Sequence, residues 1–127
     1  MQINTIRLRI ILGFLAILLP IIVAVLAVIY NCIPGHIIPP SISATYYMDP
    51  CITPFMGILI AASILLICYK GYDKLDDIIC ILAGVCGILI CLFPCGTNEF
   101  EYVGTFQVPQ NISAAIHNIS AVIYFAL

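Results

Sequence analysis

The sequence predicts an all-α fold, an integral membrane bundle of four transmembrane helices. The mean hydropathy of the 127 residues is +1.22, and 64% of them are hydrophobic while only 8% are charged. So few polar side chains cannot cover the surface of a water-soluble domain. The apolar residues also gather into four runs that polar segments separate. We therefore expect residues 1–127 to form one multi-pass membrane domain.

The first helix is predicted at residues 10–30. Its apolar run has about the 20 residues that are needed to cross roughly 30 Å of hydrocarbon. Pro20 lies near the middle, where it removes one backbone hydrogen bond and should bend the helix. Arg7 and Arg9 precede the run, so a cleaved signal peptide is the alternative interpretation. The run is long for a signal peptide, which favours a membrane span.

The second helix is predicted at residues 54–69. Thr53 is expected to cap it, and Pro54 suits the first helical position because the missing N–H has no partner there. Gly71 follows the run and is expected to adopt the left-handed conformation that often ends a helix.

The third helix is predicted at residues 78–93, between two acidic residues and a proline. Asp76 and Asp77 are expected to cap its start, and Pro94 to end it. Steps of three and four residues place its small side chains on one face, which suits close approach of another membrane helix. These residues are Cys80, Ala83, Gly84, Gly87 and Cys91. Gly57 and Ala61 in the second helix are the expected partners.

The fourth helix is predicted at residues 112–127, with Asn111 as its N-cap. A polar stripe runs along it at helical spacing through Ser113, His117, Ser120 and Tyr124. An ionisable side chain at membrane depth is costly unless it faces the bundle interior or water, so His117 is a candidate site residue. An interhelical hydrogen bond is the alternative role. The apolar run continues to the last residue, which predicts a truncated chain.

The basic residues predict the orientation in the membrane. Cytoplasmic segments are enriched in Lys and Arg, and here these residues are Arg7, Arg9, Lys70 and Lys74. The N-terminus and the loop at 70–77 are therefore expected in the cytoplasm. The loops at 31–53 and 94–111, which carry no Lys or Arg, are expected outside.

Composition and motifs exclude several functional classes. The formal net charge is −2 with no basic stripe, so we expect no nucleic-acid partner. No nucleotide-binding or hydrolase signature is present, and we expect no cofactor. Four of the seven cysteines lie in apolar runs, and Cys32, Cys51 and Cys95 lie outside them without a preferred disulfide pairing. A zinc site built on Cys32, His36 and His117 lacks a Cys-x2-Cys motif, so we expect no metal.

Four segments together resemble a known family. They are "PPSISATYY", "CYKGYDKLDD", "LAGVCGILICLFPC" and "AAIHNISAVIYF". The chain resembles small bacterial membrane proteins of domain-of-unknown-function family 998, and more distantly the Frag/DRAM/Sfk group of damage-regulated autophagy modulators. The resemblance implies about six membrane helices in the whole protein, a bacterial plasma membrane location and a function related to lipid. It also implies that Ser41, Ser43 and His117 match family positions, with Asp49 a loose match.

The candidate binding residues are those that the predicted topology brings to the outer side. They are Ser41, Ser43, Asp49, His117 and Ser120. The leading hypothesis is a non-enzymatic protein whose outer loop and His117 stripe bind a lipid or a membrane protein partner. The second is a membrane-embedded hydrolase that uses His117 with Asp49 and Ser43. A small transporter component ranks last, because no predicted span has an acid or base at its centre.

Overall fold

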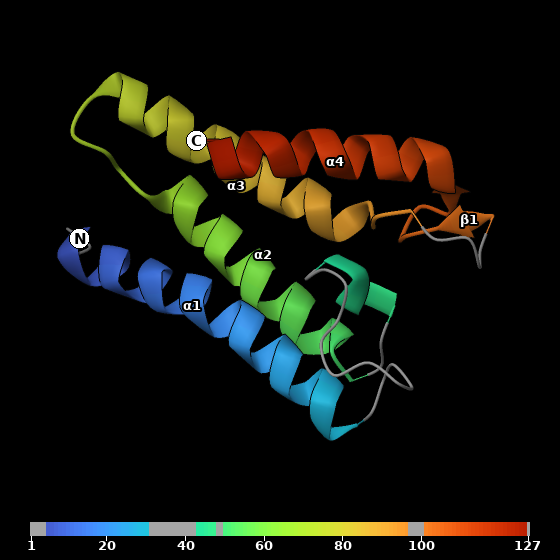
Figure 1. The fold of residues 1–127 in the computed structure, drawn as a ribbon. Helices are drawn as coiled ribbons and strands as arrows, with labels where there is room; N and C mark the ends of the chain where they lie inside the picture. Colours follow the sequence, from blue (N-terminus) through green and yellow to red (C-terminus); the bar gives the residue numbers. More distant parts are fainter. Residues whose placement is uncertain (1–4, 31–42, 48–49, 97–100, 127) are drawn as a thin grey trace.

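The computed structural model describes residues 5–30, 43–47, 50–96 and 101–126, and within them the chain is predominantly helical (Figure 1). The α-helices are α1 (Thr5–Ile29), α2 (Ile52–Cys68), α3 (Lys74–Leu92) and α4 (Gln110–Ala126). A short 3₁₀ helix, η1 (Ser43–Tyr47), lies between α1 and α2. The all-α prediction is confirmed. The antiparallel hairpin of β1 (Tyr102–Val103) and β2 (Val108–Pro109) was not predicted.

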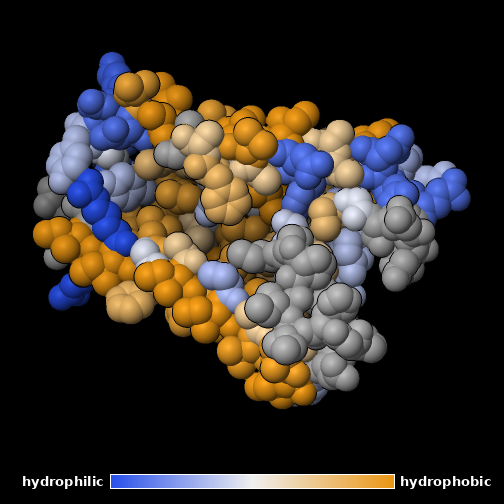
Figure 2. Space-filling model, in the orientation of Figure 1, coloured by the Kyte–Doolittle hydropathy of each residue, from blue (hydrophilic) through white to orange (hydrophobic). Residues whose placement is uncertain are grey.

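Two of the described helices are long and apolar enough to cross a membrane. They are the segments Ile6–Ile29 and Lys74–Leu92, whereas Ile52–Cys68 is a shorter apolar helix. Only 11% of the most apolar stretch of the first segment is buried within the molecule. Its outward residues are large and apolar, as in Ile10, Phe14 and Ile17. In Figure 2 such hydrophobic surface extends along the molecule between hydrophilic residues that gather toward its two ends.

The helices pack in chain order, α1 against α2, α2 against α3 and α3 against α4. The start of α1 and the loop between α2 and α3 lie at one end of the molecule (Figure 1). A hydrogen bond of 2.9 Å from Arg9 Nε to the hydroxyl of Tyr69 joins them. The opposite end holds η1, the β1–β2 hairpin and the start of α4. The loops therefore separate to the two ends as the sequence predicts.

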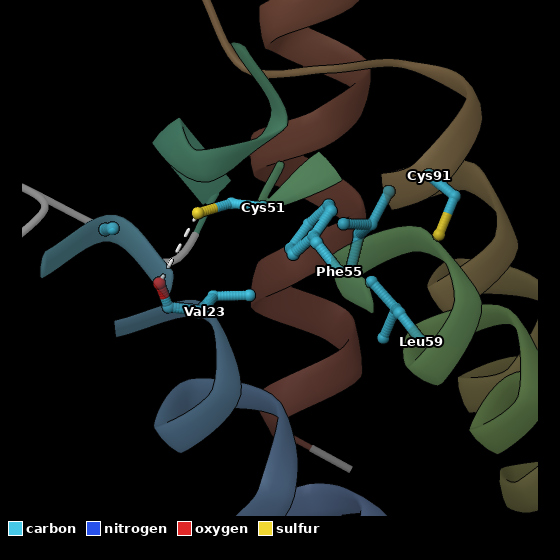
Figure 3. Close-up of a cluster of buried hydrophobic side chains, with 7 residues drawn as sticks. Val23, Cys51, Phe55, Leu59 and Cys91 are labelled. Carbon is cyan, nitrogen blue, oxygen red and sulfur yellow. Dashed lines mark hydrogen bonds between the residues drawn. The ribbon is translucent and has the colours of Figure 1, made fainter. Parts of the chain in front are cut away.

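The core lies where α1, α2 and α3 meet toward the η1 end (Figure 3). Phe55 and Leu59 of α2 fill its centre, with Val23 from α1 on one side and Cys91 from α3 on another. The Cys51 thiol donates to the carbonyl of Val23 across 3.5 Å. This contact joins the start of α2 to α1.

The small-residue face of α3 packs against α2 as predicted, but its partner on α2 is different. A Cβ on Gly84 would come within 2.6 Å of the backbone oxygen of Ser63, and a Cβ on Gly87 would meet the Ser63 side chain. The expected partners, Gly57 and Ala61, are exposed instead. Ser63 occupies this contact because its hydroxyl is already bonded to the carbonyl of Leu59, 2.7 Å away.

Several predicted helix-terminal assignments are wrong. The N-cap of α2 is Cys51 rather than Thr53, and because the helix starts at Ile52, Pro54 is not at its first position. α4 starts at Gln110, which places Asn111 inside its first turn. The N-cap of α3 is Asp73, whose carboxylate accepts two backbone N–H groups at 3.0 Å. Asp76 and Asp77 instead accept from the loop, where the Gly71 N–H donates to Asp77 at 2.6 Å. In the described residues Gly104, not Gly71, is the glycine with positive φ.

Candidate functional site

The candidate site is built around three consecutive backbone carbonyls where α3 ends. α3 ends at Leu92, and the chain leaves the helix through Phe93, whose backbone is extended, and Pro94. The carbonyls of Phe93, Pro94 and Cys95 therefore have no partner within the helix and accept from side chains. The carbonyl of Phe93 lies 2.8 Å from His117 Nδ1, and that of Pro94 accepts from Ser113 Oγ at 2.8 Å. The carbonyl of Cys95 accepts from the hydroxyl of Tyr47. Side chains from α4 and η1 thus complete the end of α3.

His117 occupies the centre of this group and uses both ring nitrogens. Because a carbonyl can only accept, Nδ1 must carry a proton. In neutral imidazole Nε2 is then an acceptor, and the hydroxyl of Ser43 lies 3.0 Å from it. We assign the Ser43 hydroxyl as the donor on this basis. The side chain of His117 is 3% exposed, so this hydrogen bond lies away from bulk water.

We call the group of Ser43, Tyr47, Ser113, His117 and Ser120 the His117 cluster. The polar stripe on α4 is confirmed, since Ser113, His117 and Ser120 are all buried. Ser120 is 4% exposed and lies one turn beyond His117 on the same face of α4. Among the described residues no buried side-chain nitrogen or oxygen lacks a hydrogen-bond partner. The polar groups of this end are therefore either satisfied or accessible to solvent or ligand.

η1 supplies two neighbouring tyrosines, Tyr46 and Tyr47, and Tyr47 is the one that belongs to the His117 cluster. Burial, followed by the neighbouring Cys95 thiol, raises the pKa of Tyr47 to about 12. Burial also raises the pKa of the Cys95 thiol. The rings of Tyr46 and Tyr47 meet edge to face with centroids 5.2 Å apart. Thr45, between Ala44 and Tyr46, is fully buried. η1 is joined to the residues after α3 by the bond from Tyr47 to Cys95, and to α4 by the bond from Ser43 to His117.

The structure brings together only part of the predicted site. Ser43 and His117 are hydrogen-bonded to each other, and Ser120 lies on the same buried face of α4 as His117. Ser41 and Asp49 lie outside the described residues, as do Cys32 and His36. Within the described ranges no three His, Cys, Asp or Glu residues lie close enough to hold a metal ion.

Sequence reasoning missed the carbonyl acceptors and the role of Tyr47. Every residue has a backbone carbonyl, so the sequence does not show which carbonyls need a side-chain donor. Pro94 was the one indication of where such carbonyls lie, because it predicts the end of the third helix.

A hollow of about 330 Å³ lies elsewhere, between α1 and α2. Its lining is aliphatic apart from Tyr124 of α4. No residue of the His117 cluster lines it, so the hollow is separate from the candidate site.

Comparisons with known proteins found no match, so the functional conclusion rests on the geometry of the site. No family model matches the chain, and neither a curated protein nor a solved structure matches it.

Proposed function

We propose that this chain is a multi-pass protein of the bacterial plasma membrane in which all four α-helices cross the bilayer. The hydropathy of Ile6–Ile29 and Lys74–Leu92 supports this proposal, as do the alternating directions of the helices. α2 and α4 have 17 residues each, or about 25 Å, so their flanking residues enter the interfaces. The four Lys and Arg residues put the N-terminus in the cytoplasm and the His117 cluster outside.

We further propose that the His117 cluster binds a membrane lipid. The observation that carries this proposal is the polar face of α4, on which Ser120 lies one turn beyond an imidazole bonded to Ser43 of η1. A ligand hydroxyl or ester carbonyl that enters along α4 would bond to Ser120. A lipid is the ligand that the resemblance to family 998 and to the Frag/DRAM/Sfk group would imply, although no family model matches the chain.

A photo-crosslinking experiment tests lipid binding at this site. The purified protein in detergent would be irradiated with a diacyl phospholipid that carries a diazirine next to its ester groups, and labelled peptides identified by mass spectrometry. We expect labelling of α4 near Ser120. Ser120→Ala should reduce it several-fold, because one hydrogen bond is worth about 1 kcal/mol. His117→Leu and Ser43→Ala should also reduce it.

Asn118→Leu provides the matched control, because Asn118 is the exposed neighbour of His117 on α4. This variant should be labelled like the unmodified protein. Equal labelling of the Ser120→Ala, His117→Leu and Ser43→Ala variants, with helix content unchanged by circular dichroism, would overturn the proposal.

A membrane-embedded ester hydrolase is a second candidate, and the distance between Ser43 and His117 favours it. A serine nucleophile needs a base within about 3 Å and a third group that orients the base. Here the base is His117, 3.0 Å from Ser43 Oγ, and the orienting group is the Phe93 carbonyl. Ser43 would attack the ester carbonyl as Nε2 takes its proton. The imidazolium would protonate the leaving alcohol, and water would then cleave the acyl-serine.

A fluorophosphonate probe separates the two candidates. The probe phosphonylates an activated serine with loss of fluoride, so a hydrolase would be labelled at Ser43. Ser43→Ala should abolish labelling, and His117→Gln should slow it at least 100-fold because general-base catalysis contributes about that factor. No labelling of the unmodified protein, or labelling that persists in Ser43→Ala, would exclude this candidate and leave lipid binding standing.

A further inference from the structure

We propose a second lipid site at the end of the molecule opposite the His117 cluster, where the phosphate headgroup of an anionic phospholipid binds. The site is the basic end, which we define as Arg7, Arg9, Lys70 and Lys74 together with Tyr69 and Tyr72. All four cations are exposed. The proposal relies on the membrane setting proposed above but not on any ligand at the His117 cluster.

Arg9 is the fixed centre of the basic end. Its Nε donates to the Tyr69 hydroxyl at 2.9 Å, and its guanidinium carbon lies 4.9 Å from the ring centroid of Tyr72. The Tyr69 ring centroid is 5.8 Å away. A guanidinium has five donors in a rigid planar fork, which two tyrosine hydroxyls cannot all occupy. The remaining donors suit the paired oxygens of a phosphodiester.

The acidic residues at this end form no ion pair with the cations in the described residues. Asp73, Asp76 and Asp77 direct their carboxylates to backbone N–H groups of the loop and the first turn of α3. In the part of the chain that the structure describes, Arg9 bonds to tyrosine and none of the four cations pairs with a carboxylate. The cations therefore remain available to the phosphate of a ligand.

The surroundings favour a lipid over a soluble phosphate. Large apolar side chains, Ile6 and Ile10, are exposed beside Arg9 on α1. A phospholipid can place its acyl chains against this surface while its phosphate reaches the guanidinium. Anionic lipids also concentrate in the cytoplasmic leaflet, where basic residues near membrane helices attract them.

Lipid binding to the purified protein in detergent tests the proposal by native mass spectrometry. We expect dioleoyl phosphatidylglycerol to bind more tightly than dioleoyl phosphatidylcholine. Arg9→Gln should weaken phosphatidylglycerol binding about fivefold and Lys70→Gln by a similar factor, since each basic residue near an anionic membrane contributes to that extent. Arg9→Lys should retain part of the preference for phosphatidylglycerol, because lysine keeps the positive charge but lacks the planar set of guanidinium donors.

Glu101→Gln is the control, because it changes one exposed charge at the opposite end. It should leave the preference unchanged. Equal binding of the two lipids, or full phosphatidylglycerol binding by both Arg9→Gln and Lys70→Gln, would overturn the proposal. Displacement of the lipid by millimolar inorganic phosphate would also overturn it, because the site would then recognise the free anion. Lys70 makes no side-chain hydrogen bond or ion pair with the described residues, so the result of Lys70→Gln stands even if Arg9→Gln fails to fold.

Discussion

His117 Nε2 and Ser43 Oγ lie 3.0 Å apart although 74 positions separate the two residues in the sequence. The bond joins the segment before α2 to α4, and the second ring nitrogen of His117 joins both to the end of α3. One buried imidazole therefore holds three parts of the chain together at this end.

Replacement of this imidazole should destabilise the fold. His117→Leu leaves the Phe93 carbonyl and the Ser43 hydroxyl without their partner, and a buried polar group that loses its partner costs about 1–3 kcal/mol. We expect a loss of that size in the free energy of unfolding, measured by chemical denaturation in detergent micelles. Asn118→Leu, on the exposed side of α4, should change it little. Equal stability of the two variants would contradict this role.

Alanine at Gly84 and at Gly87 should have different effects on α2–α3 packing. A Cβ at Gly84 meets the Ser63 backbone, which cannot move away. We expect this overpacking to cost about 1–3 kcal/mol in the free energy of unfolding. That cost should exceed the gain in helix propensity, which is up to about 1 kcal/mol. A Cβ at Gly87 meets the Ser63 side chain. Ser63→Ala should therefore partly rescue Gly87→Ala and fail to rescue Gly84→Ala.

The measurement is a double-mutant cycle of unfolding free energies. Gly57→Ala provides the control, because a Cβ there meets nothing within 4 Å. It should be neutral or slightly stabilising. Rescue of both glycine variants by Ser63→Ala would disprove the distinction between backbone and side-chain contact.

The start of α3 should depend on Asp73 more than on the two acids that follow it. Asp73→Ala removes the acceptor for two backbone N–H groups, and loss of an N-cap costs typically about 1 kcal/mol. Asp73→Asn should retain most of the stability, because asparagine caps nearly as well. Hydrogen exchange of the Leu75 and Asp76 amides would show the effect locally. Unchanged exchange in Asp73→Ala would argue against this capping role.

The Tyr47 hydroxyl should titrate well above an exposed tyrosine. Burial raises its pKa from the ordinary value of 10.0 to about 12, so between pH 10 and 12 the folded state keeps a proton that the unfolded state has lost. Stability from this group is therefore complete below pH 10 and falls as pH rises toward 12. Tyrosinate absorbance of the unmodified protein minus that of Tyr47→Phe should reveal this titration. A difference curve centred near pH 10 would contradict the burial of this hydroxyl.

Periodicity and charge predicted the larger features of the fold. Apolar runs gave all four helices, and the spacing of Ser113, His117 and Ser120 gave the buried face of α4. The sorting of loops to two ends also agrees with the structure, as the bond between Arg9 and Tyr69 shows. These features follow from single residues and their spacing, which a sequence displays directly.

Features that depend on backbone geometry were not predicted. The segment "DKLDD" offers three acids, and the cap is Asp73 because the chain turns into the helix there. The β1–β2 hairpin uses Gly104 at φ 80° and Gln107 at φ 50°, but its strands have two residues each and give no alternating pattern. The sequence suggested Ser43 and Asp49 of the outer loop as partners of His117, and it gave no indication that the Phe93 carbonyl would accept from Nδ1.

The three carbonyls from Phe93 to Cys95 also set an order for biosynthesis. η1 is made before α3 and α4 is made after it, so the ribosome has released donors for the Cys95 carbonyl before those for Phe93 and Pro94 exist. This end of the bundle can close only when α4 has been made. A nascent chain stalled before α4 should thus leave the carbonyls of Phe93 and Pro94 without the donors that His117 and Ser113 supply.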